Sequence, residues 1–386
     1  SMTNLIQFIK GLFSKKEPLP SGIFSYQTPP DADEQYRLHL RIEEDGSGIL
    51  VINASTVLHL NQTAVEYAYH LIHQTDAQQV AKRLSERYQV DEEQARQDFD
   101  DFKDKIMTLI EMPDLDPVTY LDIERQEPYS EKLSAPYRLD CALTYRVGQG
   151  SLQEHAPLDR VDRELTTDEW IEILHKAYNL GIPHVIFTGG EPTLRQDLIE
   201  IIHQAEVIGL VTGLLTDGLK LQEDAFLKDL LIKGLDHLTI ILDPTNEGQW
   251  RALEKVFPQD LFTTVHLTLH QGEHLEPHIK RLAEMGANAL SLSTPDEDLE
   301  PQLQRLRDYA AMQTLALVWD VPVPYSHNNP VALELEGEGY DEVPEGAGKA
   351  WLYVEPDGDV LPAQGMYNQV LGNLLTDPWE KIWENR

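Results

Sequence analysis

From residue 135 onward, short apolar runs alternate with stretches of helical periodicity. The apolar runs are typical of buried strands: Leu139–Tyr145, His184–Phe187, Val211–Leu215, His237–Leu242, Val265–Leu269, Ala289–Ser293 and Leu315–Trp319. The helical stretches are 167–180, 195–208, 223–232, 273–285 and 299–312, and Thr166 with Glu169 forms a capping box before the first. Recurrent units of this kind predict an α/β domain with a parallel sheet, either a barrel or a doubly wound sheet.

The pattern before this domain is different. Residues 35–60 alternate apolar and polar side chains around the Asp45-Gly46 turn, which predicts short antiparallel strands. Three amphipathic helical patterns follow, with apolar faces at Ala64, Ala68, Leu71 and Ile72, at Val80, Leu84 and Tyr88, and at Ala95, Phe99, Phe102, Ile106 and Leu109. A small sheet followed by three helices predicts a winged-helix-like α+β domain, and several prolines after residue 112 mark a linker.

The two ends of the chain carry separate patterns. Residues 4–16, NLIQFIKGLFSKK, predict an amphipathic helix that either contacts a membrane surface or a partner, or packs on the protein itself. Near the C-terminus, KAWLYVEPDGDVLPAQG predicts a hairpin around Pro356-Asp357-Gly358. The patterns therefore divide the chain into residues 1–20, 21–113, 114–134, 135–320 and 321–386.

Composition excludes several classes of function. The chain of 386 residues carries a formal net charge of −35, which repels phosphate backbones and argues against nucleic-acid binding. No apolar run is long enough to span a bilayer and no signal peptide is evident, so we expect a cytoplasmic protein. The single cysteine, Cys141, excludes an internal disulfide framework and any all-thiolate metal site within one chain.

The candidate chemistry lies at Gly189-Gly190-Glu191-Pro192, directly after a predicted strand. Ligands bind at the carboxyl ends of the strands in βα barrels. The glycines allow close approach of the backbone, the glutamate supplies a carboxylate, and the proline suits the first turn of a helix. A tight strand-to-helix turn alone would explain the glycines but not the glutamate.

The sequence around this motif resembles the radical S-adenosylmethionine (SAM) superfamily. The resemblance covers residues 135–320 and rests on the TYR sequence after the first strand, on LTTDEW, on LGIPHVIFTGGEPTLRQDLIEII and on GLVTGLLTDGLKL. It implies a partial (β/α)6-type barrel, a CxxxCxxC loop that holds a [4Fe–4S] cluster, and SAM across the strand ends. By this resemblance the SAM-binding residues would be Gly189, Gly190, Glu191, Pro192, Thr216 and Asp217.

Two further resemblances concern the flanking segments. EGAGKAWLYVEPDGDVLPAQG and LGNLLTDPWEKIW, within residues 321–386, resemble the auxiliary-cluster extension called SPASM or twitch. Residues 21–113 resemble the PqqD-like peptide chaperones, also called RiPP recognition elements. That resemblance implies a precursor-peptide partner bound through residues 35–112 as an added strand.

The cysteines that these resemblances imply are absent. Aligned on the TYR sequence, the three cluster positions are Val147, Ser151 and Glu154, and the two positions in the extension are Glu345 and Ala363. Cys141 lies within a predicted strand, where we expect a core residue, and we expect the loop residue His155 to be solvated. We therefore expect no catalytic residue, no metal site and no cofactor, with the SAM site only a remnant.

Three functions remain open, in order of preference. The first is a non-catalytic protein that binds a peptide or protein partner as a scaffold in a peptide-modification system. The second is an enzyme that still binds SAM or another nucleotide at Gly189–Pro192 and works without a cluster. The third is an adaptor that contacts a membrane through residues 4–16.

Overall fold

The computed structural model describes residues 19–53, 56–111, 134–148, 157–317 and 346–386. The chain divides into two compact units, unit 1 (residues 1–130) and unit 2 (residues 131–386), and each is considered by itself. In the described ranges, no helix is long and apolar enough to cross a membrane. The amphipathic helix expected over residues 1–20 and most of the linker 114–134 lie outside these ranges.

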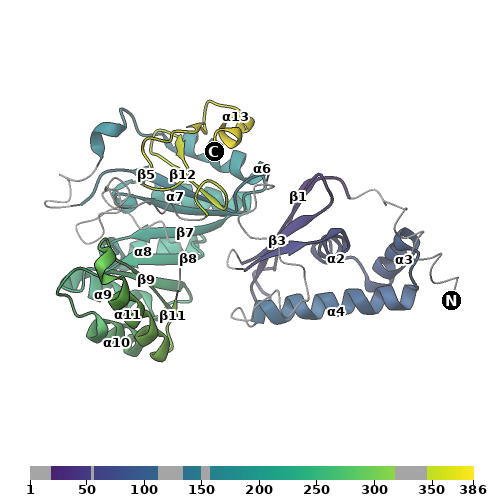
Figure 1. Cartoon of the computed structure of the whole chain (residues 1–386), viewed down its shortest axis with the longest axis horizontal. Helices are drawn as coiled ribbons and strands as arrows, with labels where there is room; N and C mark the ends of the chain where they lie inside the picture. The colour runs from purple at the N-terminus through teal and green to yellow at the C-terminus, as the bar shows by residue number, and fades with distance from the viewer. Residues whose placement is uncertain (1–18, 54–55, 112–133, 149–156, 318–345) are drawn as a thin grey trace. The chain divides into compact units, whose positions relative to one another are not determined.

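Unit 1 is an antiparallel sheet of four strands followed by three helices (Figure 1). The strands in sheet order are β1 (Gly22–Gln27), β2 (Arg37–Ile42), β3 (Gly48–Ile52) and β4 (Thr56–Leu60), and the helices are α2 (Gln62–Ile72), α3 (Ala77–Tyr88) and α4 (Glu92–Glu111). The alternation over residues 35–60 correctly predicted β2 to β4, whereas β1 was not expected.

Alternation along β2 and β3 explains how this sheet packs. Leu38, Leu40 and Leu50 join Ala68 of α2 and Ile106 of α4 in one buried cluster. Because neighbouring side chains on a strand point to opposite faces, the residues between these leucines lie on the other face of the sheet. Helices α2 and α4 therefore cover one face of the sheet, whereas α3 packs on α4 in a separate cluster. The strands at the two edges of the sheet are β1 and β4.

Unit 2 contains a sheet of ten strands. In sheet order they are β11 (Ala316–Leu317), β10 (Ala289–Ser293), β9 (Phe262–Thr268), β8 (His237–Ile241), β7 (Val211–Thr216), β6 (His184–Gly189), β5 (Arg138–Thr144), β12 (Trp351–Val354), β13 (Asp359–Leu361) and β14 (Gly372–Asn373). The strands from β11 through β12 are mutually parallel, and the last two pairings are antiparallel. The expected parallel α/β sheet is confirmed.

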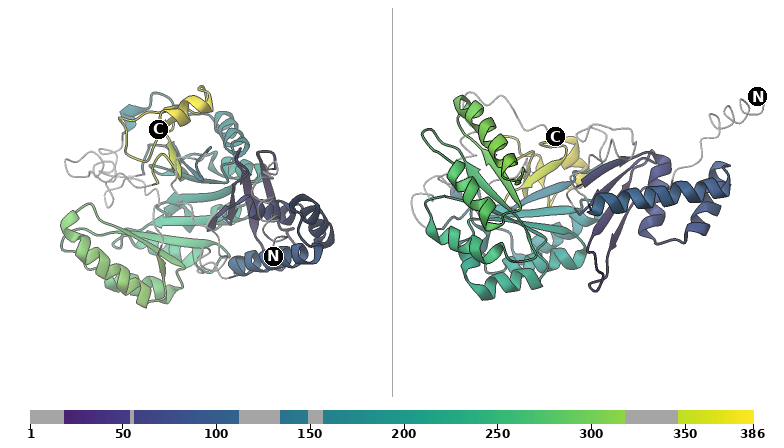
Figure 2. Two further views of the ribbon diagram at one scale, coloured as in Figure 1. Left: turned by 45° about the vertical axis from the view of Figure 1, so that its right-hand side comes forward. Right: turned by 90° about the horizontal axis from the view of Figure 1, so that it is seen from below.

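Helices follow most of the parallel strands and pack on one face of this sheet (Figure 2). They are α6 (Thr167–Asn179), α7 (Leu198–Ile208), α8 (Asp224–Ile232), α9 (Glu247–Val256), α10 (Glu276–Met285) and α11 (Glu300–Met312), with α13 (Trp379–Glu384) near the C-terminus. The capping box predicted at Thr166 and Glu169 is present at the start of α6. Helices on one face are typical of an open barrel and not of a doubly wound sheet, which has helices on both faces.

The other face of the parallel sheet is largely polar in its later strands. Buried His266 of β9 lies with its Nδ1 atom 2.9 Å from the hydroxyl of Ser291 and its Nε2 atom 3.0 Å from that of Ser293. The interior of a complete barrel is normally filled by branched apolar side chains. In β9 the branched apolar side chains, Val265 and Leu267, lie on the helix-covered face instead. The other face keeps a small apolar cluster of Ile186, Leu215 and Ile241.

Candidate functional site

The candidate site is the turn Gly189-Gly190-Glu191-Pro192 at the carboxyl end of β6. Gly189 has a φ of +137°, and a Cβ atom there would lie 2.1 Å from the carbonyl oxygen of Thr144. A Cβ atom on Gly190 would lie 2.1 Å from the carbonyl oxygen of Arg146. Both glycines are thus required because the turn lies directly against the backbone that follows β5.

Backbone hydrogen bonds fix this close approach. The N–H of Gly190 donates to the carbonyl of Thr144 over 2.8 Å, and the N–H of Glu191 donates to the carbonyl of Arg146 over 2.7 Å. The segment after β5, where the superfamily resemblance places the cluster loop, is therefore held by the β6 turn. The glycines serve this backbone contact in the structure.

The carboxylate of Glu191 joins the ends of two strands. It is buried, and it accepts hydrogen bonds from the N–H of Thr193 over 3.0 Å and the hydroxyl of Thr193 over 2.5 Å. It also accepts from the hydroxyl of Thr216 over 2.8 Å and from the N–H of Asp217 over 2.7 Å. Two backbone and two hydroxyl donors occupy the carboxylate, so its acceptor positions are used within the protein.

Two opposing influences act on this carboxylate. Burial, followed by the neighbouring charge of Asp217, raises the pKa of Glu191, while the donors of Thr193 and Asp217 act in the opposite direction. Burial also raises the pKa of Asp217. Two carboxyl groups this close share a low-dielectric site, in which ionisation of one disfavours ionisation of the other.

The turn Thr216-Asp217-Gly218 lies beside Glu191 and closes the end of β7. Gly218 has a φ of +80°, which favours glycine, and the side chain of Asp217 accepts a hydrogen bond from Leu219 N over 2.9 Å. The structure therefore brings together the residues Gly189, Gly190, Glu191, Pro192, Thr216 and Asp217 that the resemblance assigned to one site.

Gln249 of α9 belongs to the same site and was missed from the sequence. Its side-chain amide donates to the carbonyls of Asp217 and Ile241, each over 2.6 Å, and its amide oxygen accepts from the N–H of Asp243 over 2.8 Å. It is 3% exposed. A buried glutamine in an amphipathic helix was the available signal, because a buried amide requires partners.

Val147, the first of the expected cluster positions, is a core residue. It is buried and packs in a cluster with Ala142, Tyr145, Tyr353 and Leu361. An aliphatic side chain in an apolar cluster offers no ligand atom. The positions Ser151, Glu154 and His155, and Glu345 in the extension, lie outside the described residues.

Ala363, the second cysteine position expected in the extension, is described and buried. A methyl side chain cannot ligate iron. The hairpin expected around Pro356-Asp357-Gly358 is present as β12 and β13.

A polar network connects this region to the start of unit 2. The hydroxyl of Tyr145 donates to Glu355 over 2.8 Å, and Arg160 forms an ion pair with the same carboxylate. Arg160 also donates to the carbonyl of Tyr367 over 2.7 Å and lies over the ring of that tyrosine. Burial is the main cause of a raised pKa of Glu355. Sequence reasoning missed the network because its members lie far apart in the chain.

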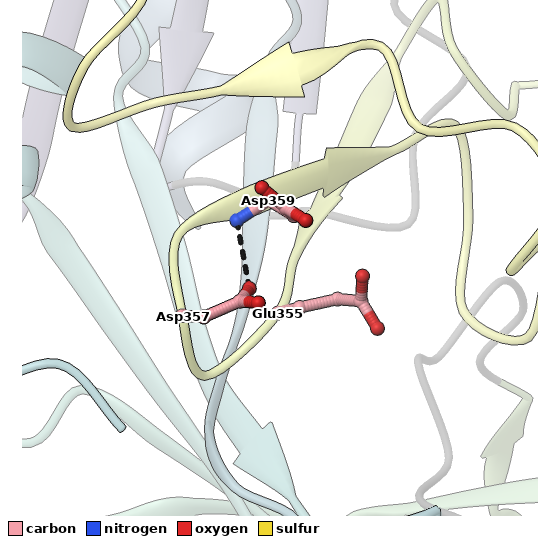
Figure 3. A group of neighbouring side chains, drawn as sticks. All are labelled: Glu355, Asp357 and Asp359. Carbon is pink, nitrogen blue, oxygen red and sulfur yellow. Dashed lines mark hydrogen bonds between the residues drawn. The ribbon is translucent and has the colours of Figure 1, made fainter. Parts of the chain in front are cut away.

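Glu355, Asp357 and Asp359 form a group of carboxylates at the tip of the hairpin (Figure 3). One oxygen from each lies within 4.8 Å of the others. Each already has a partner: Asp359 N donates to Asp357 over 3.1 Å, Asn373 donates to Asp359 over 3.0 Å, and Glu355 pairs as described above. These hydrogen bonds and the ion pair account for the position of the three carboxylates within the turn of the hairpin.

The residues of the chain do not fit a thiolate-held iron–sulfur cluster. Such a cluster in this superfamily takes three cysteines from one loop, and Cys141 is the only cysteine in the sequence. Its thiol is buried on the helix-covered face of β5, where burial raises its pKa well above the usual range. Cys141 is thus the core residue expected from the sequence.

Comparisons with known proteins agree with the fold. Residues 141–266 match the family model of the radical SAM superfamily. The chain is 28% identical over 282 residues to a PqqA peptide cyclase of Streptomyces rochei. The aligned region covers 65% of this chain and 76% of that protein. It is 35% identical over 128 residues to a PqqA peptide cyclase of Bradyrhizobium diazoefficiens, 33% of each chain.

Among solved structures, Streptococcus suis SuiB is similar over 90% of this chain and 86% of that chain, with a TM-score of 0.57 and 15% sequence identity. SuiB bound to S-adenosylmethionine gives the same values. SuiB bound to the precursor peptide SuiA gives a TM-score of 0.57 at 14% identity. At this identity the likeness shows a shared fold. The sequence similarity to the radical SAM superfamily is confined to residues 141–266 in the family comparison.

These comparisons contradict the expectation that the chain takes no cofactor. The matched superfamily and the SAM-bound SuiB structure point to SAM and an iron–sulfur cluster as the cofactors of such proteins. The expectation was wrong because it rested on the cysteine count. That count limits thiolate ligation, but it does not decide whether backbone and side-chain groups at the strand ends bind SAM.

Proposed function

We propose that this chain binds a peptide through unit 1 and that it catalyses no reaction by itself. In this proposal residues 21–113 act as a PqqD-like binding domain, and residues 321–386 are a SPASM-like extension with a structural role. The matches to two PqqA peptide cyclases and to SuiB bound to its precursor peptide support a peptide as the partner.

The observation that carries the proposal is the open antiparallel sheet of unit 1. Among the described residues β1 pairs with β2 alone, and β4 pairs with β3 alone. An extended peptide can add to such an edge, where main-chain hydrogen bonds supply affinity and alternate side chains supply specificity. Partly buried apolar side chains of α2 and α4, such as Tyr69 and Met107, pack against the core of this sheet.

Residues of unit 2 support the non-catalytic part of the proposal. The carboxylate of Glu191 is occupied by donors of the protein, and Val147 is buried among apolar side chains. SAM binding is compatible with this role, because binding requires no thiolate.

The test combines a binding measurement with a reaction measurement. Fluorescence anisotropy with labelled extended peptides should report binding to the full chain. The same protein, reconstituted anaerobically with iron and sulfide and then reduced, should produce no 5′-deoxyadenosine from SAM. Stoichiometric [4Fe–4S] absorbance with SAM cleavage would reject the non-catalytic role, and absence of binding to every peptide would reject the binding role.

A second candidate function, a cluster-independent enzyme that binds SAM or another nucleotide at Gly189–Pro192, is favoured by the position of that turn within the matched residues 141–266. Isothermal titration with SAM tests it, comparing the wild type with Glu191→Ala. Equal affinity of the two proteins would place the ligand elsewhere, and no heat with either would reject this candidate.

A further inference from the structure

We propose that the groove between α8 and α9 of unit 2 is a self-association surface, at which a second copy of this chain docks through a two-fold contact. Self-association of unit 2 is independent of the peptide-binding function proposed above. The groove has a volume of about 560 Å³. It is lined by Asp224, Leu227, Lys228, Leu231, Ile232, Glu254, Lys255, Pro258 and Gln259.

The floor of the groove is apolar. Leu227 and Leu231 lie one turn apart on α8, so they share one face of the helix. Leu227 is buried, and Leu231 is partly buried against the core of unit 2. Pro258 follows the end of α9 and supplies apolar lining on the other side. The groove therefore offers apolar surface that an entering side chain can remove from water.

Ile232 is the exposed apolar residue of this surface. It is the last residue of α8, it lines the groove, and 67% of it is exposed. A single exposed apolar residue is common on protein surfaces, but this one lies beside a groove with an apolar floor. In a two-fold contact the Ile232 side chain of each copy enters the groove of the other, because one patch supplies both the projecting group and the recess.

The charges around the groove favour a second copy of this chain as the occupant. The lining holds two acidic and two basic side chains, whereas the whole chain holds 66 acidic and 31 basic side chains. The excess of acid elsewhere on the chain repels another copy, but the balanced charges at the groove do not. A strongly acidic or strongly basic partner would find no excess of opposite charge there. Balanced charge of this kind is the complementarity that self-association requires.

Two of the four charged groups pair with each other, and two remain for a partner. The Nζ atom of Lys255 lies 2.7 Å from a carboxylate oxygen of Asp224, which joins α9 to α8. Lys228 of α8 and Glu254 of α9 are both exposed, and neither forms an ion pair within the part of the chain that the structure describes. A two-fold axis through the groove brings Lys228 of each copy to Glu254 of the other, which makes two reciprocal ion pairs.

Sedimentation velocity of the full chain over a range of concentrations, at physiological salt, tests for self-association. An interface built around one groove is small, so we expect a dimer with a dissociation constant on the order of 10 µM. A protein that stays monomeric up to about 200 µM would overturn the proposal and leave the groove to a different partner. Growth beyond the dimer would also overturn it, because a two-fold contact closes after two copies.

Two matched variants test the apolar part of the contact. Ile232→Glu places a charge where the side chain enters the groove of the other copy, so we expect it to weaken dimerisation about tenfold or more. Val207, 65% exposed near the end of α7, lies outside the groove, and Val207→Glu should leave dimerisation unchanged. Both positions are exposed, so both variants should keep the stability of the wild type. Equal effects of the two variants would overturn the site.

A mixing experiment tests the reciprocal ion pairs. In a dimer of Lys228→Glu two carboxylates meet at each contact, and in a dimer of Glu254→Lys two ammonium groups meet. Each variant alone should therefore dimerise at least about tenfold more weakly than the wild type. An equimolar mixture has opposite charges at both contacts again, so it should form a heterodimer of nearly wild-type affinity.

The matched control for mixing is Lys82→Glu with Glu86→Lys, which changes two exposed charges on α3 of unit 1. These variants should show neither the loss of dimerisation nor its recovery in the mixture. Loss in the groove variants without recovery on mixing, or no loss in either of them, would overturn the two-fold contact.

Discussion

At the scale of single residues, Glu191 shows how a motif interpreted as a ligand site can instead hold the ends of two strands together. Its carboxylate receives donors from the turn after β6 and from the turn after β7. Replacement by glutamine would place an amide N–H against one of these donors, and a buried donor without an acceptor costs about 1–3 kcal/mol. We expect Glu191→Gln to lower the free energy of unfolding of unit 2 by about that amount in urea denaturation.

The matched control is Glu200→Gln, an exposed glutamate of α7. Its effect should stay within about 0.5 kcal/mol, as for most surface substitutions. Equal stability of the two variants would mean that the Glu191 bonds contribute nothing net.

The family resemblance assigned Glu191, Thr216 and Asp217 to one SAM site, and that assignment stays a prediction. The structure shows that the three residues lie together, because parallel strands end at one edge of the sheet. Motif spacing could not reveal Gln249, Arg160 or Glu355, because each acts through partners in distant elements. Hydrophobic periodicity carries no information on such pairings.

At the scale of elements, the turn after β6 lies so close to the segment after β5 that Gly190 has no room for a side chain. A Cβ atom on Gly190 would lie 2.1 Å from the carbonyl oxygen of Arg146, whereas a Cβ atom on Gly148, only two residues beyond Arg146, would meet no atom within 4 Å. Gly190→Ala should therefore lower the melting temperature by several degrees, consistent with about 1–3 kcal/mol for overpacking. Gly148→Ala should leave it nearly unchanged, and similar shifts for both would contradict the argument.

Elements with strong periodicity were predicted well, and those without it were missed. The helices α2, α3 and α4 agree with the apolar faces read from the sequence. The edge strand β1 was missed because GIFSYQ lies at an edge, where its side chains are only partly buried and need not alternate in polarity. Burial explains both outcomes, because an element shows a regular pattern of apolar and polar residues only where one side of it is buried.

At the scale of the whole molecule, buried neutral histidines couple stability to pH. Burial lowers the pKa of His39, His70 and His237 to about 4 and that of His266 to about 3. Since these values lie below the unfolded value of about 6.5, the unfolded chain binds protons first as the pH falls. The stabilisation is complete above pH 6.5 and should be lost progressively between pH 6.5 and 4.

Two of these histidines belong to each unit, so both units should lose stability on acidification. The expected measurement is urea denaturation from pH 7.5 to 5, with a slope approaching about 1.4 kcal/mol per pH unit for each histidine. His266→Gln should reduce the slope for unit 2 by up to the contribution of one histidine, about 1.4 kcal/mol per pH unit. In unit 2 the raised pKa values of carboxyl groups such as Glu191, Asp217 and Glu355 act in the opposite direction and reduce the slope. A flat profile for unit 1 would therefore contradict the neutral state of His39 and His70.

The parallel pairing of β12 with β5 has a consequence for the synthesis of the protein. β5 is the first strand of unit 2, and the strand beside it is made only after all the other parallel strands have been translated. Until then one side of β5 has no neighbour in the finished sheet, and exposed strand edges invite association with other chains. A ribosome that stalls before residue 351 would therefore hold a sheet with an open side, and we expect nascent unit 2 to need chaperones until its final hairpin has been made.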